Sequence, residues 1–347
     1  MITRRGLFAA LRIGGYLLIF GFLGWQVWRV RAGLAGSLRT VGGTRIAVAV
    51  AVTSLAWVPS FLAWHLVLAG LGTRLPLAES YRLRFLAMLT NYLPGGVWPA
   101  VALAVQAKQR GHPPGRFAAA FIGTQLLTLL VGLVVGLLAL PVLVTANAVW
   151  WLLVPAAVLG LTPVAAPGLL RALLGGVQRL LRRGGTPVPL PDRRTLTVAS
   201  GLAGAGWLLG GAHVAILAAA FGTDAWTAAA IGIGGFALSV AAGAAALVLP
   251  RGLGAREVAL GLVLATLLSG PALVTVVALS RAVITAADAV STVVGFAVLF
   301  WQRRSAARAV PATGPGPDRT GRAGTVSWVN GATGRPVAAA VTEEEPC

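Results

Sequence analysis

Long apolar stretches dominate the chain and alternate with short segments that carry most of its charge. Six of them reach the length of about 20 residues that a helix needs to cross the hydrocarbon core of a bilayer. They occupy residues 8–28, 46–69, 117–140, 148–170, 196–221 and 272–300. The pattern predicts an all-α integral membrane protein with about six full transmembrane helices.

Two further apolar regions are interrupted by proline and glycine, which end a regular helix. The interruptions are Pro94, Gly95 and Gly96 within residues 81–107, and Pro250 within residues 226–268. The arms beside the first break are short, and so is the arm after Pro250. We therefore predict two broken or re-entrant helical hairpins, although residues 226–249 are long enough to cross alone, and the sequence leaves that choice open.

The two halves of the chain, 46–140 and 196–300, repeat one order of elements. In each half a helix with one histidine, His65 or His213, precedes a broken segment and then a full helix. The halves would cross the membrane in opposite directions, as in an inverted-topology repeat. A chance likeness between helices rich in Leu, Ala and Gly is the alternative.

We expect one polytopic membrane domain over residues 1–301. Residues 302–347 are rich in Pro, Gly, Ala and Arg and poor in large apolar residues. Such a segment cannot bury enough apolar surface to fold, which predicts a disordered tail.

The net charge of +19 does not indicate nucleic acid, because the arginines lie between apolar spans. Residues 171–194 hold six arginines, whereas 141–147, 222–225 and 269–271 hold no basic residue. Basic loops stay on the cytoplasmic side, so the two kinds of loop are predicted on opposite sides and both termini in the cytoplasm. The arginine-rich segment 29–45 departs from this rule, and its role is left open.

Charged residues gather at the second break, where Arg251, Arg256 and Glu257 stand beside Gly252 and Gly254. A helix that resumes there points its N-terminus toward the break, and such a terminus attracts anions. Arginine matches phosphate oxygens with two parallel hydrogen bonds. We predict that Arg251, Arg256, Gly252 and Gly254 bind a lipid headgroup. Glu257 either orients Arg256 in an ion pair or is a first-turn residue favoured by the helix dipole.

A polar pathway is predicted from Glu257, from Arg281 and Asp288 on the last helix, and from Asn91 and Tyr92 before the first break. Ionisable residues at membrane depth are costly and usually face the protein interior. Arg281 and Asp288 are seven residues apart and share a helix face. A buried structural pair and a substrate contact are equally good interpretations.

Other polar residues receive structural interpretations. Arg82, Arg84 and Lys108 are interpreted as solvated charges at the cytoplasmic headgroup level. His65, His213 and Gln125 are interpreted as hydrogen-bonding partners between helices rather than as ligands.

The sequence gives no support for catalysis. It contains no nucleophile elbow, phosphate-binding loop, dinucleotide fingerprint or zinc motif. The single cysteine, Cys347, cannot form a disulfide within the chain. No catalytic residue, metal ion or cofactor is predicted.

Two motifs carry a resemblance to a known family. They are Asn91-Tyr92-Leu93-Pro94-Gly95-Gly96-Val97-Trp98-Pro99, and Pro250-Arg251-Gly252-Leu253-Gly254-Ala255-Arg256-Glu257 followed by Ser280-Arg281. In this order they resemble the lysylphosphatidylglycerol synthase transmembrane-region family, also called flippase-like, over roughly residues 7–301. In its best-known bacterial members a similar membrane part moves aminoacylated phosphatidylglycerol to the outer leaflet, and a separate soluble domain attaches the amino acid.

The resemblance implies a flippase-like or scramblase-like protein of the bacterial plasma membrane that translocates a lipid with an anionic headgroup. We expect no aminoacyltransferase domain in this chain. The alternative is a membrane component of polyprenyl-phosphate-linked glycosylation or of a lipid-modifying enzyme system. Expected partners are membrane phospholipids or polyprenyl-phosphate lipids and a separate lipid-modifying or glycosyl transferase, without nucleic acid. A membrane scaffold is the non-catalytic third interpretation.

The sequence departs from the family pattern at two places. Trp98-Pro99-Ala100 stands where many relatives have Gly-Glu and an arginine, and Gln125 stands in a helix where an acidic residue is common. Proton coupling through those carboxylates is therefore in doubt.

Overall fold

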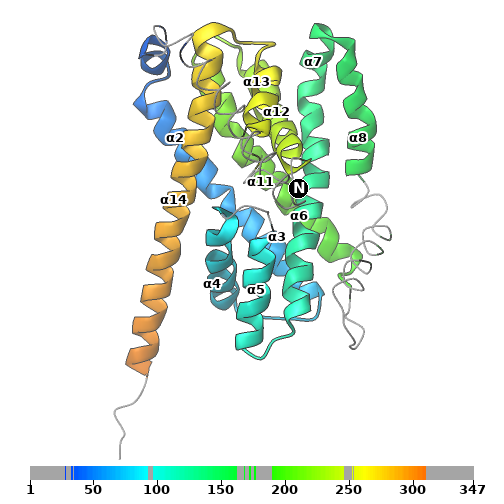
Figure 1. Ribbon diagram of the computed structural model, residues 1–347, viewed down its shortest axis with the longest axis vertical. Coiled ribbons are helices and arrows are strands. Elements are labelled where there is room, and N and C mark those ends of the chain that lie inside the picture. The colour runs from blue at the N-terminus through cyan, green and yellow to red at the C-terminus, as the bar shows by residue number, and fades with distance from the viewer. Residues whose placement is uncertain are drawn as a thin grey trace, which may run out of the picture. The chain divides into compact units, whose positions relative to one another are not determined.

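The computed structural model describes residues 35–92, 97–161, 190–245 and 254–309, and the single positions 28, 33, 168, 172, 176 and 252. This part of the chain forms helices and no strands (Figure 1). The chain divides into two units, Met1–Phe300 and Trp301–Cys347. The predicted all-α class is confirmed.

The helices follow in one series along the chain. They are α2 (Gly43–Leu55), α3 (Trp57–Gly70), α4 (Leu77–Met88), η1 (Leu89–Tyr92), α5 (Trp98–Gln109), α6 (Pro114–Gly136), η2 (Leu137–Ala139), α7 (Leu140–Ala146), η3 (Ala148–Leu152), α8 (Leu153–Gly160), α11 (Arg193–Ala219), α12 (Ala225–Ala245), α13 (Ala255–Leu264) and α14 (Gly270–Ala309).

Five helical stretches in the described residues are long and apolar enough to cross a membrane. They are Gly43–Gly70, Pro114–Ala146, Arg193–Ala219, Ala225–Ala244 and Gly270–Trp301. Four coincide with predicted spans, and the fifth, α12, shows that the first arm of the second broken region has the length of a crossing. The predicted span 8–28 lies outside the described residues. Of the span 148–170, the structure describes a shorter helical part at Ala148–Gly160.

The predicted extent of the loop 141–147 is wrong, because the helix continues through it. The helix passes from α6 through η2 into α7, with Pro141 in the first turn of α7. Proline is tolerated in a first helical turn, where its missing N–H has no partner to lose. The chain turns at Asn147, whose side chain accepts a hydrogen bond of 2.8 Å from the Val149 N–H.

The two broken regions lie toward opposite ends of the first unit. Helices α4 and α5 pack together in the lower part of Figure 1, whereas α13 lies in the upper part against α12. Helix α11 runs between them and contacts α2, α3, α6 and α12.

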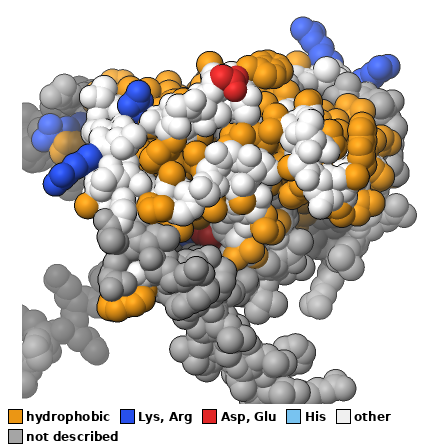
Figure 2. Space-filling view, turned by 90° about the horizontal axis from the view of Figure 1, so that it is seen from above, with side chains coloured by type: hydrophobic (Ala, Val, Ile, Leu, Met, Phe, Trp, Pro, Cys, Tyr) orange, Lys and Arg blue, Asp and Glu red, His pale blue; other side chains and the backbone are white. Residues whose placement is uncertain are grey.

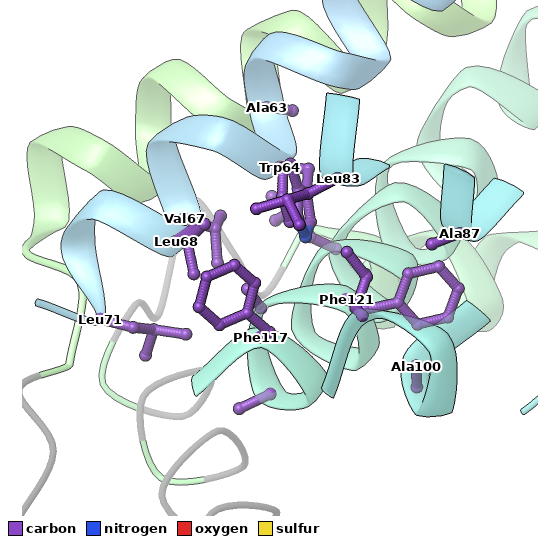
Figure 3. Packing of buried hydrophobic residues seen from close by; sticks show 14 of the residues in the cluster. Ala63, Trp64, Val67, Leu68, Leu71, Leu83, Ala87, Ala100, Phe117 and Phe121 are labelled. Carbon is purple, nitrogen blue, oxygen red and sulfur yellow. The ribbon is translucent and has the colours of Figure 1, made fainter. Parts of the chain in front are cut away.

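Small residues allow these helices to approach closely. A Cβ atom on Gly211 of α11 would lie 2.7 Å from the Ile233 Cα of α12, and one on Gly132 of α6 would lie 2.7 Å from the Trp207 ring. Membrane helices associate through such contacts, because lipid provides no hydrophobic driving force between them. A cluster around Trp64, Phe117 and Phe121 fills the space between α3, α4, α5 and α6 (Figure 3).

Asp224, just before α12, gives a prediction on pH. Its carboxylate accepts a hydrogen bond of 3.0 Å from the Thr227 N–H, and the hydrogen bonds from Thr227 lower the pKa of Asp224 below its usual value of 3.8. A lowered pKa means that the capping contribution is full above about pH 4 and is lost as pH falls through the folded-state pKa. We expect Asp224→Ala to lower the thermal midpoint modestly at pH 7, with a smaller effect at pH 3. The measurement is thermal unfolding in detergent at pH 7 and pH 3. If Asp224→Ala lowered the thermal midpoint equally at both pH values, the ionised carboxylate would not be the source of the capping contribution.

Candidate functional site

The second break brings the chain back against α12. Gly252 and Gly254 are buried and adopt φ angles of +67° and +84°, a region that side chains other than glycine rarely enter. A Cβ on Gly252 would lie 2.6 Å from the Gly243 Cα of α12. Gly252 therefore allows a backbone-to-backbone approach. The predicted site residues Pro250 and Arg251 lie outside the described residues.

Glu257 holds the start of α13 and joins it to α14. Its Oε2 accepts a hydrogen bond of 2.7 Å from the Gly254 N–H, and its Oε1 lies 3.3 Å from Arg281 Nη1. Glu257 is thus a first-turn residue that accepts a hydrogen bond from the N-cap N–H, which has no partner within the helix. Its ion-pair partner is Arg281, 24 positions further along the chain, which no local pattern could identify.

Arg256 packs its guanidinium on an aromatic ring. Its Cζ lies 4.7 Å from the ring centroid of Phe236 on α12. The same ring meets His213 edge-to-face at 4.9 Å. A cation over an aromatic face is attracted by the negative potential of the ring, so Phe236 fixes Arg256 at the N-terminus of α13. The predicted headgroup role of Arg256 stays a prediction.

His213 links α11 to α14 beneath this site. It is fully buried, with Nδ1 bonded to the Gly210 carbonyl and Nε2 2.8 Å from Ser280 Oγ. Since a carbonyl only accepts, Nδ1 carries the proton and Nε2 accepts from the Ser280 hydroxyl. In the first half, His65 Nδ1 lies 2.9 Å from Ser80 Oγ and joins α3 to α4. Both histidines are confirmed as partners between helices.

Gln125 does not follow that interpretation. Its side chain is exposed on α6 instead of lying between the described helices. The buried stripe of α6 runs through Phe121, Thr124 and Leu127 and places position 125 on another face. The prediction that Gln125 joins two helices is wrong for the described residues.

Little space remains among the charged groups of the second break. Arg256, Glu257, Ser280 and Arg281 share a cavity of about 10 Å³. A cavity of that size holds one water at most. In this conformation a lipid headgroup cannot enter between α13 and α14.

The predicted polar pathway is divided between two places. Asp288 is buried about 10 Å further along α14 than Arg281, at about 1.5 Å per residue, and lines a different and larger cavity. Asn91 and Tyr92 form the end of η1, and the structure describes their backbone only. The predicted break residues Pro94, Gly95 and Gly96 lie outside the described residues.

Arg84 corrects the interpretation of the first hairpin. It is only 7% exposed, and its Cζ lies 4.9 Å from the Phe121 ring and 5.6 Å from the Trp64 ring. It is therefore not a solvated charge. A sequence signal existed: Ser80, Leu83, Arg84 and Ala87 follow the i, i+3, i+4, i+7 spacing of a buried helix face.

The five membrane-length helical stretches in the described residues define an all-α polytopic membrane protein. The family model described as "Lysylphosphatidylglycerol synthase TM region" matches residues 10–300. The chain belongs to this family, as the resemblance implied, and is a multi-pass membrane protein. None of the curated proteins matches the chain.

Proposed function

We propose that this protein translocates a lipid with an anionic headgroup between the two leaflets of the membrane, as a flippase or scramblase. The observation that carries the proposal is the group Arg256, Glu257 and Arg281 at the N-terminus of α13, within a bundle of membrane-length helices. Charge at such a position is costly and usually serves a substrate or an ion. Membership of the family supports a membrane function.

Each charged group has a defined part in the proposed mechanism. The N-terminus of α13 and Arg256 attract the phosphate, and Phe236 holds the guanidinium of Arg256 in place. Arg281 Nη1 lies 3.3 Å from Glu257 Oε1. A phosphate that reaches Arg281 competes with the Glu257 carboxylate, so Glu257 acts as a counter-ion that the substrate displaces. The acyl chains stay in the surrounding lipid.

The arrangement of the two hairpins supports an inverted repeat as the framework of this movement. The α4–α5 and α12–α13 pairs lie toward opposite ends of the first unit. Each pair follows a helix whose histidine bonds to a serine, Ser80 or Ser280. Two such breaks leave backbone groups in the interior that a headgroup can use.

The distribution of basic residues supports the proposed orientation in a bacterial plasma membrane, with both termini in the cytoplasm. The α3–α4 and α5–α6 turns and the start of α11 contain Arg74, Arg110 and Arg193. The turns at 147, 222–224 and 265–269 contain no basic residue. Among the described residues, the view onto that end shows mostly apolar and uncharged atoms, with Lys or Arg side chains at its edges (Figure 2). Arg39, shortly before α2, and Arg45, in its first turn, are the exceptions. Basic turns stay in the cytoplasm.

The headgroup role of Arg256 is tested by selectivity. We expect Arg256→Ala to slow translocation of fluorescent phosphatidylglycerol about tenfold in proteoliposomes, since a charge-assisted bond to phosphate is lost. Arg256→Lys keeps the charge without the paired hydrogen bonds, so its translocation rate should lie between those of the wild type and Arg256→Ala. Arg110→Ala, in the α5–α6 turn, is the matched control. Unchanged rates in folded Arg256→Ala would contradict the role, and movement of polyprenyl phosphate alone would favour the glycosylation alternative.

A further inference from the structure

A large apolar cavity lies between helices of the first half and α14, away from the group at the second break. Its volume is about 680 Å³, within the range of small-molecule sites. Its walls come from the end of α2 and the start of α3, from α4, and from the middle of α14. The edge-to-face contact of Phe85 with Phe296, at 5.3 Å between centroids, joins α4 to α14 beside it.

The rim of this cavity is apolar and exposed. Leu55, Val58 and Val294 line it and are 57%, 55% and 49% exposed. They belong to the membrane-length stretches Gly43–Gly70 and Gly270–Trp301. Exposed apolar side chains on such stretches contact lipid, so the cavity is open to the hydrocarbon region.

One cation interrupts the apolar wall. Arg84 lines the cavity from α4, is nine-tenths buried, and its Nη1 has no hydrogen-bond partner within the part of the chain that the structure describes. Arginine keeps its charge, and a buried donor without a partner is costly. The rings of Trp64 and Phe121 offset only part of that cost, since they accept no strong hydrogen bond. An anion that accepts a hydrogen bond from Arg84 Nη1 would satisfy both the charge and the donor.

We propose that this cavity binds an anionic lipid, with one hydrocarbon chain between α3, α4 and α14 and the headgroup phosphate on Arg84. A soluble anion is disfavoured as the occupant, because nearly all of the remaining lining is apolar. The inference goes beyond the proposed translocation, since binding here is measurable whether or not lipid is moved.

Photolabelling in nanodiscs tests the proposal on the full chain. The discs consist of phosphatidylcholine with a small share of either phosphatidylglycerol or phosphatidylcholine that carries a diazirine on one acyl chain. We expect the phosphatidylglycerol probe to label the walls at 54–62, 77–89 and 288–298 about tenfold more than the phosphatidylcholine probe, because the choline cation of phosphatidylcholine offsets the charge of its phosphate and is repelled by Arg84. Arg84→Met should remove that preference, Arg84→Lys should keep part of it, and Arg82→Met on the same helix should leave it unchanged.

A second variant guards against misfolding of Arg84→Met. Ala78 is exposed and lines the cavity. Ala78→Trp therefore fills the space for the hydrocarbon chain of the lipid and should remove wall labelling by both probes. Equal labelling by the two probes would mean that acyl chains enter the cavity without selection for the headgroup, and this result overturns the proposal. So does a preference for phosphatidylglycerol that persists in folded Arg84→Met, or wall labelling that persists in folded Ala78→Trp. Absence of wall labelling in folded wild-type protein overturns it in favour of another occupant, such as a partner helix. Selective labelling without translocation would keep this inference and overturn the proposed function.

Discussion

Glu257→Leu will lower the free energy of unfolding by about 3 kcal/mol, because it removes a hydrogen bond at the start of α13 and one partner of a partly buried ion pair. The substitution breaks the contact of 3.3 Å to Arg281 and the hydrogen bond of 2.7 Å from the Gly254 N–H. Glu257→Gln keeps an oxygen that accepts from Gly254 and loses only the charge. The free energy of unfolding should therefore fall about half as much in Glu257→Gln as in Glu257→Leu. Unfolding titrations with a denaturing detergent measure both values.

A double-mutant cycle isolates the ion pair. Arg281→Met alone should destabilise, whereas Glu257→Leu together with Arg281→Met should lose less than the sum, since an apolar pair replaces a charged one. Glu79→Gln is the matched control, because Glu79 stands in the first turn of α4 and has no ion pair among the described residues. It should change stability by less than about 0.5 kcal/mol. If the losses in free energy of unfolding of the two single variants added up in the double variant, the claim that Glu257 and Arg281 interact would be contradicted.

Gly252→Ala will destabilise the protein by a comparable amount, about 3 kcal/mol, for a different reason. Its φ angle of +67° costs a residue with a Cβ about 1–2 kcal/mol, and the added atom would lie 2.6 Å from the Gly243 Cα. The contact is with backbone, which cannot rotate away as a side chain does. The break would have to move away from α12 and carry Arg256 off the Phe236 ring. Thermal unfolding and translocation should both fall.

Two other glycines separate these causes. Gly111 has a φ of +74° with no atom within 4 Å of an added Cβ, so Gly111→Ala measures the cost of the backbone angle alone. Gly261 on α13 has only Val277 at 3.9 Å, so Gly261→Ala should be neutral or slightly stabilising. If Gly252→Ala and Gly111→Ala cost the same, the close approach to Gly243 has no energetic weight.

The membrane-crossing helices were predictable because length and hydropathy are local properties of the sequence. The four predicted spans that the structure describes appear with ends displaced by only a few residues, except where α6 continues through Pro141 into α7. Pro141 was interpreted as the start of a loop, but a proline in a first helical turn is compatible with a continuing helix.

The composition of the second break was predictable, and its contacts were not. Charges next to Pro250 stand out in an apolar chain. The partner of Glu257, however, lies on α14, and the support of Arg256 comes from Phe236 on α12. Both contacts depend on how helices pack, which no pattern within one segment contains.

Arg84 shows the opposite case, in which a local signal was present and carried less weight than a general rule. Its spacing from Ser80 and Leu83 places it on the buried face of α4. The neighbouring Arg82 and the positive-inside rule favoured a solvated charge instead. The cavity beside Arg84 could not be predicted, because α3, α4 and α14 come together only in the folded chain.

Lipid movement in proteoliposomes tests the central claim most directly. The wild-type protein is reconstituted at increasing protein-to-lipid ratios, and the loss of fluorescence of labelled phosphatidylglycerol or phosphatidylcholine to a membrane-impermeant quencher is followed. The account predicts that phosphatidylglycerol in the inner leaflet becomes accessible at a rate that rises with protein density and exceeds that of phosphatidylcholine. A rate equal to that of protein-free liposomes for phosphatidylglycerol and for polyprenyl phosphate would contradict it.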